Sequence, residues 1–197
     1  MINRAVIKIF FAISLIVLCV AAIVGFCSIT SDLEVVLTEK QCKNLFGKTP
    51  EEFVEDPYPD DPYIDWTGVV FCESASIDES GNLIFTLTPE QQDVWVYCIQ
   101  HRLDRAKNNP NVTLSPNYRE ISVRCYEETA YKNVHDASFA SYGYLVIQLV
   151  NGVSPDEIKV DITLIDSGTE KVVYVRTSNL NQTGFCYSKN DFSSMPE

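Results

Sequence analysis

The hydrophobic pattern opens with an uninterrupted apolar run at residues 9–27, which follows Arg4 and Lys8. A helix rises about 1.5 Å per residue, so this run covers roughly 28 Å, close to the hydrocarbon thickness of a bilayer. Two positive charges precede the run and an acidic sequence follows it. The positive-inside rule therefore predicts a cytoplasmic N-terminus at 1–8, a single-pass anchor in the cell membrane at 9–27 and a C-terminal domain outside.

Two other interpretations of the same run stay open. Val20, Ala21 and Ala22 form a weak small-residue cleavage site, which is compatible with a signal segment that is removed and a secreted protein. Cys27 is also a candidate for lipid modification, although Phe26 stands where lipoprotein signals have a small residue. All three interpretations export the rest of the chain.

Short elements are predicted directly after this run. Residues 31–37 are typical of a stalk or a first strand, and residues 38–46 predict a short helix. Thr38 is the expected cap of that helix and Gly47 its stop. Thr49 begins a second helix, because a proline occupies the first helical position and a glutamate completes a capping box.

A hairpin and a long helix are the best-defined elements of the pattern. Residues 66–77 and 83–87 are predicted strands, and the sequence DESGN between them supplies turn chemistry. Thr88 then opens a helix, with proline at the first position and a glutamine that closes a capping box. Apolar residues recur at helical spacing as far as Ala106, and the sequence Asn-Asn-Pro ends the helix.

The second half of the chain predicts three strands and one segment of ambiguous type. Residues 119–126 alternate between apolar and polar, which is typical of a strand with one wet face. Residues 129–137 are expected to be loop. Residues 139–150 fit a buried strand or a buried helix, and their length favours a helix. Residues 157–165 and 171–177 alternate around the turn sequence DSGT and predict a hairpin.

The order of these elements indicates an α+β fold. A two-layer antiparallel sheet with helices on one face would bury the apolar sides of both kinds of element, behind the N-terminal transmembrane helix or signal segment. The expected organisation is short helices and an acidic loop at 28–65, an α+β extracytoplasmic domain at 66–178 and a polar tail at 179–197.

Net charge narrows the classes of partner. The formal charge of the chain is −12 at pH 7. The charged residues among the first thirty, Arg4 and Lys8, are both positive, so the rest of the chain is more acidic still. Such a domain is repelled by nucleic acid and by anionic headgroups, so no nucleic-acid partner is expected. The acidity suits a cationic partner or divalent ions, and it also serves solubility.

Cysteine usage leaves two interpretations open. Two of the seven cysteines belong to the apolar run. The other five lie in the exported part, where disulfides persist, but the sequence does not set their pairing. Small buried apolar side chains are the equal alternative. The possible disulfide cysteines are Cys42, Cys72, Cys98, Cys125 and Cys186.

Residues 55–65 form an acidic stretch with prolines and tyrosines, which we name the contact loop. Proline forbids helix and central strand, so the loop is expected to be extended, exposed and stiff. Exposed aromatic residues in a stiff segment cost little entropy to order, which makes the loop a candidate interaction surface. Its acids also suggest a calcium site, although no D-x-D-x-D-G sequence is present. The candidate contact residues are Tyr58, Asp60, Asp61, Tyr63 and Asp65.

Few sequence motifs of this chain resemble the catalytic motifs of known enzymes. The sequence LIDSGT at 164–169 resembles the Asp-Thr/Ser-Gly signature of aspartic proteases. A second copy of the motif is absent, and the same residues are ordinary turn chemistry. A Ser-His-Asp or Cys-His hydrolase would have to use His101 or His135, the two histidines of the chain. The residue types suited to a metal are Cys98, His101 and Asp104 at helical spacing, with His135 and Asp136.

Together these features favour a membrane-anchored or exported acidic α+β domain that is a non-enzymatic binding or interaction module. Its partner outside the cell would be a protein, a wall polymer or a ligand, and no cofactor is expected. The alternatives are an envelope hydrolase that uses His101 or His135 and a calcium- or metal-binding module.

Overall fold

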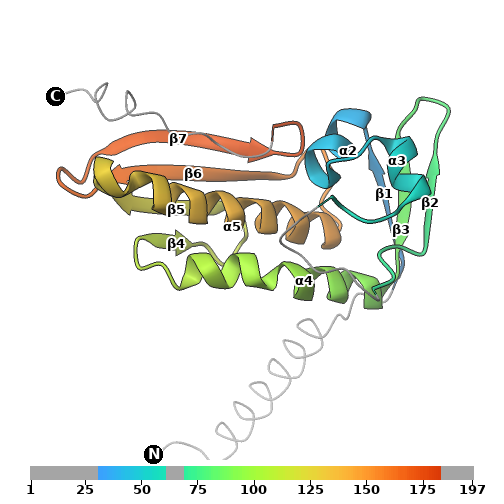
Figure 1. The fold of residues 1–197 in the computed structure, drawn as a ribbon, viewed down its shortest axis with the longest axis horizontal. Coiled ribbons are helices and arrows are strands. Elements are labelled where there is room, and N and C mark those ends of the chain that lie inside the picture. Colours follow the sequence, from blue (N-terminus) through green and yellow to red (C-terminus); the bar gives the residue numbers. More distant parts are fainter. Residues whose placement is uncertain (1–30, 61–68, 183–197) are drawn as a thin grey trace, which may run out of the picture. The chain divides into compact units, whose positions relative to one another are not determined.

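The computed structural model describes residues 31–60 and 69–182, and of residue 101 only the backbone. From Leu33 onward the described chain belongs to one unit, and it has an α+β fold with two sheets. The predicted anchor at 9–27 lies outside the described residues. In chain order the described elements are β1 (Leu33–Leu37), α2 (Glu39–Phe46), α3 (Pro50–Glu55), β2 (Ser74–Ile77), β3 (Leu83–Leu87), α4 (Pro89–Lys107), β4 (Val112–Leu114), β5 (Glu120–Cys125), the 3₁₀ helix η1 (Glu127–Thr129), α5 (Ala130–Val150), β6 (Lys159–Asp166) and β7 (Val172–Asn179) (Figure 1).

Capping boxes begin the helices α2, α3 and α4, as their sequences predict. Thr38, Thr49 and Thr88 each accept a hydrogen bond from the backbone N–H three residues on, and the side chain there bonds back to the threonine N–H. This exchange satisfies two backbone donors that the first turn of a helix leaves without partners. Gly47 ends α2 with φ +76°, a conformation that suits glycine. The predicted helix starts and the Gly47 stop are confirmed.

The first sheet is antiparallel throughout, with strand order β1-β3-β2. Val35 lies opposite Phe85 and Leu37 opposite Leu83, so one face of the sheet is buried. The predicted β2–β3 hairpin is confirmed, but its first strand begins only at Ser74. Because β1 pairs with β3, the described residues before the expected boundary at residue 65 belong to the same unit as those after it.

An aromatic cluster joins this sheet to three helices. Phe46 of α2 stacks on Phe53 of α3, with ring centroids 4.6 Å apart, and meets Phe85 of β3 edge-on at 5.8 Å. Trp95 of α4 lies 4.1 Å from Phe71, and its indole N–H donates to the Phe71 carbonyl at 2.7 Å. All five side chains are buried. The cluster therefore fixes α2, α3 and α4 on one face of the first sheet.

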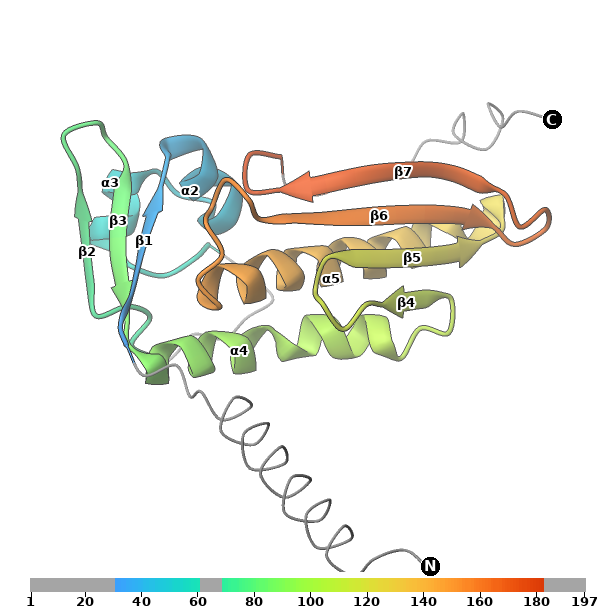
Figure 2. The same ribbon diagram turned by 180° about the vertical axis from the view of Figure 1, so that it is seen from behind.

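The second sheet has the order β4-β5-β6-β7, and its β5 and β6 strands are parallel while the other pairs are antiparallel. The expectation of one antiparallel sheet is therefore wrong. The reason is α5, which joins β5 to β6 and contacts both (Figure 2). A strand, a crossover helix and a second strand of the same sheet run parallel. The predicted β6–β7 hairpin is confirmed.

Helix α5 is 21 residues long, so the loop expected at 129–137 is wrong and the helix favoured at 139–150 is correct. Its start lacks the signal that marked the other helices, because Thr129 makes no side-chain capping bond. Packing against α4 holds the helix in place of a strong cap. A Cβ on Gly143 would meet a terminal methyl of the Leu103 side chain at 3.0 Å, so the two helices approach closely there.

The described chain ends shortly after the last strand of the second sheet. β7 extends to Asn179, and Leu180 after it is fully buried. Asn179 and Gln182 then pair in a tight turn. The short strand β4 was not predicted from the sequence. Across the described ranges 31–60 and 69–182, no helix combines the length and apolar character needed to cross a membrane.

Truncation of Phe46 tests the aromatic cluster. We expect Phe46→Ala to lower the free energy of unfolding by about 3–5 kcal/mol, because it removes a buried ring with several aromatic neighbours. Urea denaturation followed by tryptophan fluorescence measures the change. Tyr97→Ala is the matched control, since Tyr97 is 82% exposed on α4, and a change within about 0.5 kcal/mol is expected there. Equal stabilities of the two variants would contradict the role of the cluster.

Candidate functional site

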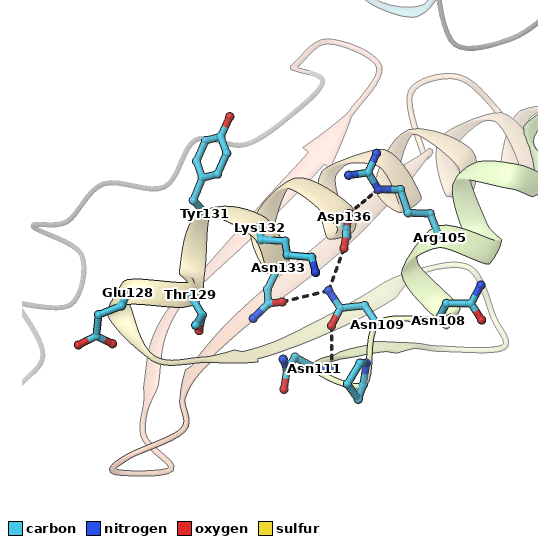
Figure 3. Close-up of a pocket in the computed structure, with 11 residues that line it drawn as sticks. Arg105, Asn108, Asn109, Asn111, Glu128, Thr129, Tyr131, Lys132, Asn133 and Asp136 are labelled. Carbon is cyan, nitrogen blue, oxygen red and sulfur yellow. Dashed lines mark hydrogen bonds and ion pairs between the residues drawn. The ribbon is translucent and has the colours of Figure 1, made fainter.

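A pocket of about 730 Å³ lies where the end of α4 meets the start of α5. The last turn of α4, the turn at 108–111, the 3₁₀ helix η1 and the first turns of α5 line it (Figure 3). Its size is within the usual range of small-molecule sites. Most of its lining residues are polar, whereas most of the surface that they present to the pocket is apolar, so the pocket offers both hydrogen-bonding groups and apolar contact area.

Three buried polar side chains form the floor of this pocket. The Asn109 amide donates to Asp136 Oδ2 at 2.8 Å and to Asn133 Oδ1 at 3.0 Å. The side-chain carbonyl oxygen of Asn109, Oδ1, accepts a hydrogen bond from the backbone N–H of Asn111 at 3.0 Å. Asp136 is only 3% exposed. Buried polar groups are costly unless they are bonded, and this floor is a closed network, which we name the floor network.

Arg105 supplies the charge that the buried carboxylate needs. Its Nε donates to Asp136 Oδ1 at 2.6 Å, while about half of the Arg105 side chain stays exposed. The guanidinium carbon also lies 5.3 Å above the Phe139 ring. Both Asp136 oxygens thus have partners, one cationic and one neutral. The carboxylate is held as an ion-paired acceptor.

The rim of the pocket is exposed and carries the groups that a ligand would meet first. Asn108 and Asn111 come from the turn after α4, and Glu128, Tyr131 and Lys132 come from η1 and the start of α5. Tyr131 is 75% exposed. In Figure 3 its ring stands at the edge of the site, away from the floor network. The site therefore combines a fixed floor with an accessible rim.

Comparison with known proteins finds no matching family model, and neither a curated protein nor a solved structure matches the chain.

The polar side chains of the pocket floor are hydrogen-bonded to one another. Among its described lining residues there is no serine or cysteine. The Thr129 hydroxyl donates to the Tyr126 carbonyl at 3.2 Å, whereas an activated nucleophile needs a base within hydrogen-bond reach. The Asp136 carboxylate is engaged by Arg105 and Asn109. The arrangement can donate and accept hydrogen bonds to a ligand.

The contact loop is described only as far as Asp60. Tyr58 is half-buried, its hydroxyl donates to the Val69 carbonyl at 2.8 Å, and its ring lies 6.2 Å from Phe71. It is thus anchored to the core and is not the exposed aromatic side chain that was expected. Asp60 is exposed, and its backbone N–H donates to the Phe46 carbonyl. The other candidates lie outside the described residues: Asp61, Tyr63 and Asp65.

His135 is half-buried beside the pocket, and its Nδ1 lies 3.5 Å from Arg105 Nη2. Its ring packs near Phe139 and Tyr131. A catalytic histidine needs an acid or a nucleophile within reach, and the group that His135 meets is a permanent cation. The side chain of His101 lies outside the described part of the chain, so its proposed role stays a prediction.

Two of the side chains considered as metal ligands are engaged in other interactions. Asp136 binds Arg105, and Asp104 accepts a hydrogen bond from Gln100 at 2.8 Å. In the part of the chain that the structure describes, no three His, Cys, Asp or Glu side chains are grouped so that they could hold a metal ion.

Asp166 of the LIDSGT sequence is a turn residue. Its carboxylate accepts the Thr169 hydroxyl at 2.7 Å and the backbone N–H groups of Gly168 and Thr169. These hydrogen bonds, that from the Thr169 side chain first, lower the pKa of Asp166. A catalytic pair of aspartates instead shares a proton, and one of its pKa values is raised. The geometry is that of the β6–β7 hairpin turn.

The described cysteines lie in or beside the core. Cys42, Cys72 and Cys125 are buried free thiols, and Cys98 is half-buried on α4. Burial raises the pKa of Cys42 to about 12, with further contributions from Glu51 and Glu52. Burial likewise raises the pKa of Cys72 and of Cys125 to about 11. Cys186 lies outside the described residues, so its predicted pairing stays a prediction.

Removal of the Asn109 amide tests the floor network. Asn109→Ala leaves Asn133 Oδ1 and Asp136 Oδ2 without this donor, and we expect the free energy of unfolding to fall by about 1–3 kcal/mol. Asn108→Ala is the matched control, because Asn108 is the exposed residue next to Asn109. Its free energy of unfolding is expected to change by no more than about 0.5 kcal/mol. Urea denaturation measures both variants. If Asn108→Ala lowered the free energy of unfolding as much as Asn109→Ala does, the floor network would not be the source of the stability.

Thiol labelling tests the chemistry of the buried cysteines. A thiol reacts as the thiolate, so a raised pKa reduces the reactive fraction to about one thousandth or less near pH 8. We expect iodoacetamide to leave Cys42, Cys72 and Cys125 unmodified in the folded protein and to modify all three in concentrated urea. Mass spectrometry of the peptides reads the result. Fast labelling of any one in the folded protein would contradict its burial.

Proposed function

We propose that this protein is a non-enzymatic binding module that faces the outside of the cell, tethered by a transmembrane segment at residues 9–27. The unbroken apolar run after Arg4 and Lys8 supports the tether and its orientation. The net charge of −12 supports a domain that is dissolved in water and does not bind nucleic acid. The ligand would enter the pocket between α4 and α5.

The floor network is the observation that carries the binding role. It fixes Asp136, Asn109 and Asn133 in one arrangement before any ligand arrives. A site that is ordered in advance loses little entropy on binding. The same network supplies no activated nucleophile, and this supports binding in place of hydrolysis.

We also propose a two-layer arrangement for this part of the domain. The contacts of α5 with β5 and β6, and of α4 with β4, support one layer of helices over one face of the second sheet. The pocket would then lie at the end of the helical layer, on the surface that a partner outside the membrane can approach. That partner is a protein, a wall polymer or a smaller ligand.

Protease accessibility in cells tests the tether. With an epitope at each terminus of the full chain, we expect an external protease to remove the C-terminal epitope and to spare the N-terminal one. The intact chain should stay with the membrane after alkaline carbonate extraction, and a Cys27→Ser variant should do the same.

Each alternative gives a different result. A mature protein that lacks the N-terminal epitope and appears in the medium would indicate signal cleavage. Loss of membrane association in Cys27→Ser would indicate a lipid anchor. A C-terminal epitope that is protected in intact cells and exposed only after lysis would overturn the outward-facing role.

A further inference from the structure

We infer that the pocket between α4 and α5 binds an uncharged, hydroxyl-rich ligand, a saccharide unit of an extracellular polymer. This inference rests on the proposed function and names the ligand class of the same site.

The charges of the pocket argue for an uncharged ligand. Arg105 and Asp136 neutralise each other at 2.6 Å, and the rim adds one cation, Lys132, and one anion, Glu128. A cationic ligand would find the buried carboxylate already compensated. An anionic ligand would approach a protein whose formal charge is −12. An uncharged ligand meets neither obstacle.

The hydrogen-bonding groups argue for hydroxyls. The exposed amides of Asn108 and Asn111 each provide two donors and an acceptor. A hydroxyl group also donates and accepts, so neighbouring hydroxyls of a sugar match an amide in both directions. Asp136 is 3% exposed and both of its oxygens already accept hydrogen bonds, so the rim amides provide the hydrogen bonds to the ligand.

Tyr131 supplies the flat surface that a sugar ring would cover. Its side chain is 75% exposed, and its ring is nearly parallel to that of His135, with centroids 6.2 Å apart. This exposed aromatic ring offers apolar area to the C–H face of a sugar while its hydroxyl stays in water. The volume of about 730 Å³ accommodates more than one sugar ring.

Calorimetric titration of the full chain in detergent micelles tests the inference. The probes are three neutral tetrasaccharides (cellotetraose, maltotetraose and tetra-N-acetylchitotetraose), the anionic tetragalacturonate and the cationic glucosamine tetramer. We expect at least one neutral probe to bind. Tyr131→Ala should weaken that binding by about tenfold, the order of one stacked ring.

Two further variants locate the binding. Asn108→Ala should also weaken it, because the variant removes a rim amide. Tyr97→Ala removes an exposed tyrosine of α4 that does not line the pocket, and it should leave the affinity within twofold of the original. Thermal unfolding of each variant checks that the fold is retained.

The outcomes separate the ligand class from the site. Binding of a charged probe alone, with loss in Tyr131→Ala, would overturn the ligand class and leave the pocket as the binding site. Neutral binding that Tyr131→Ala and Asn108→Ala do not change would overturn the pocket. No binding by any of the probes would overturn both the ligand class and the pocket as the ligand site.

Discussion

The packing of α5 is the constraint on which the rest of the described structure depends. The helix joins β5 to β6 and so makes them parallel neighbours. It approaches α4 closely at Gly143, where an added Cβ would meet the Leu103 side chain at 3.0 Å. Near its end, the Gln148 amide donates to the Tyr118 carbonyl at 2.8 Å and to the Lys159 carbonyl at 3.0 Å. These bonds tie the helix to the turn before β5 and to the start of β6.

The pocket is a consequence of the same packing. At its first turns α5 places Asn133 and Asp136 opposite the turn that ends α4, where Asn109 and Arg105 complete their hydrogen bonds. An unpaired carboxylate at that depth would be destabilising, so the network first serves the junction of the two helices. A binding role uses what this junction leaves exposed, the amides, the charged groups and the tyrosine of the rim. The stability of the floor and the availability of the rim are therefore separate properties of one site.

The sequence predicts those parts of the fold whose causes are local. The capping boxes at Thr38, Thr49 and Thr88 mark their helices, because each involves residues only three apart. The alternation in β5, β6 and β7 marks strands for the same reason. The start of α5 is missed because Thr129 makes no capping bond, and contact with a distant helix holds it. The second half of α5, at 139–150, was favoured as a helix, but the expectation of an antiparallel sheet overlooked that a helix crossing between two strands of one sheet makes them parallel.

The sequence by itself determined the apolar run at 9–27, the acidity of the rest and most element positions, because each depends on residues close together in the chain. Only the tertiary structure decided the site. Asn109 looks in sequence like a helix stop, and Asp136 like one acid among many. Their hydrogen bond joins residues 27 positions apart, which no spacing rule links. For Tyr58 the sequence predicted a site residue that the fold removes. An exposed aromatic side chain was expected, and the fold packs it near Phe71.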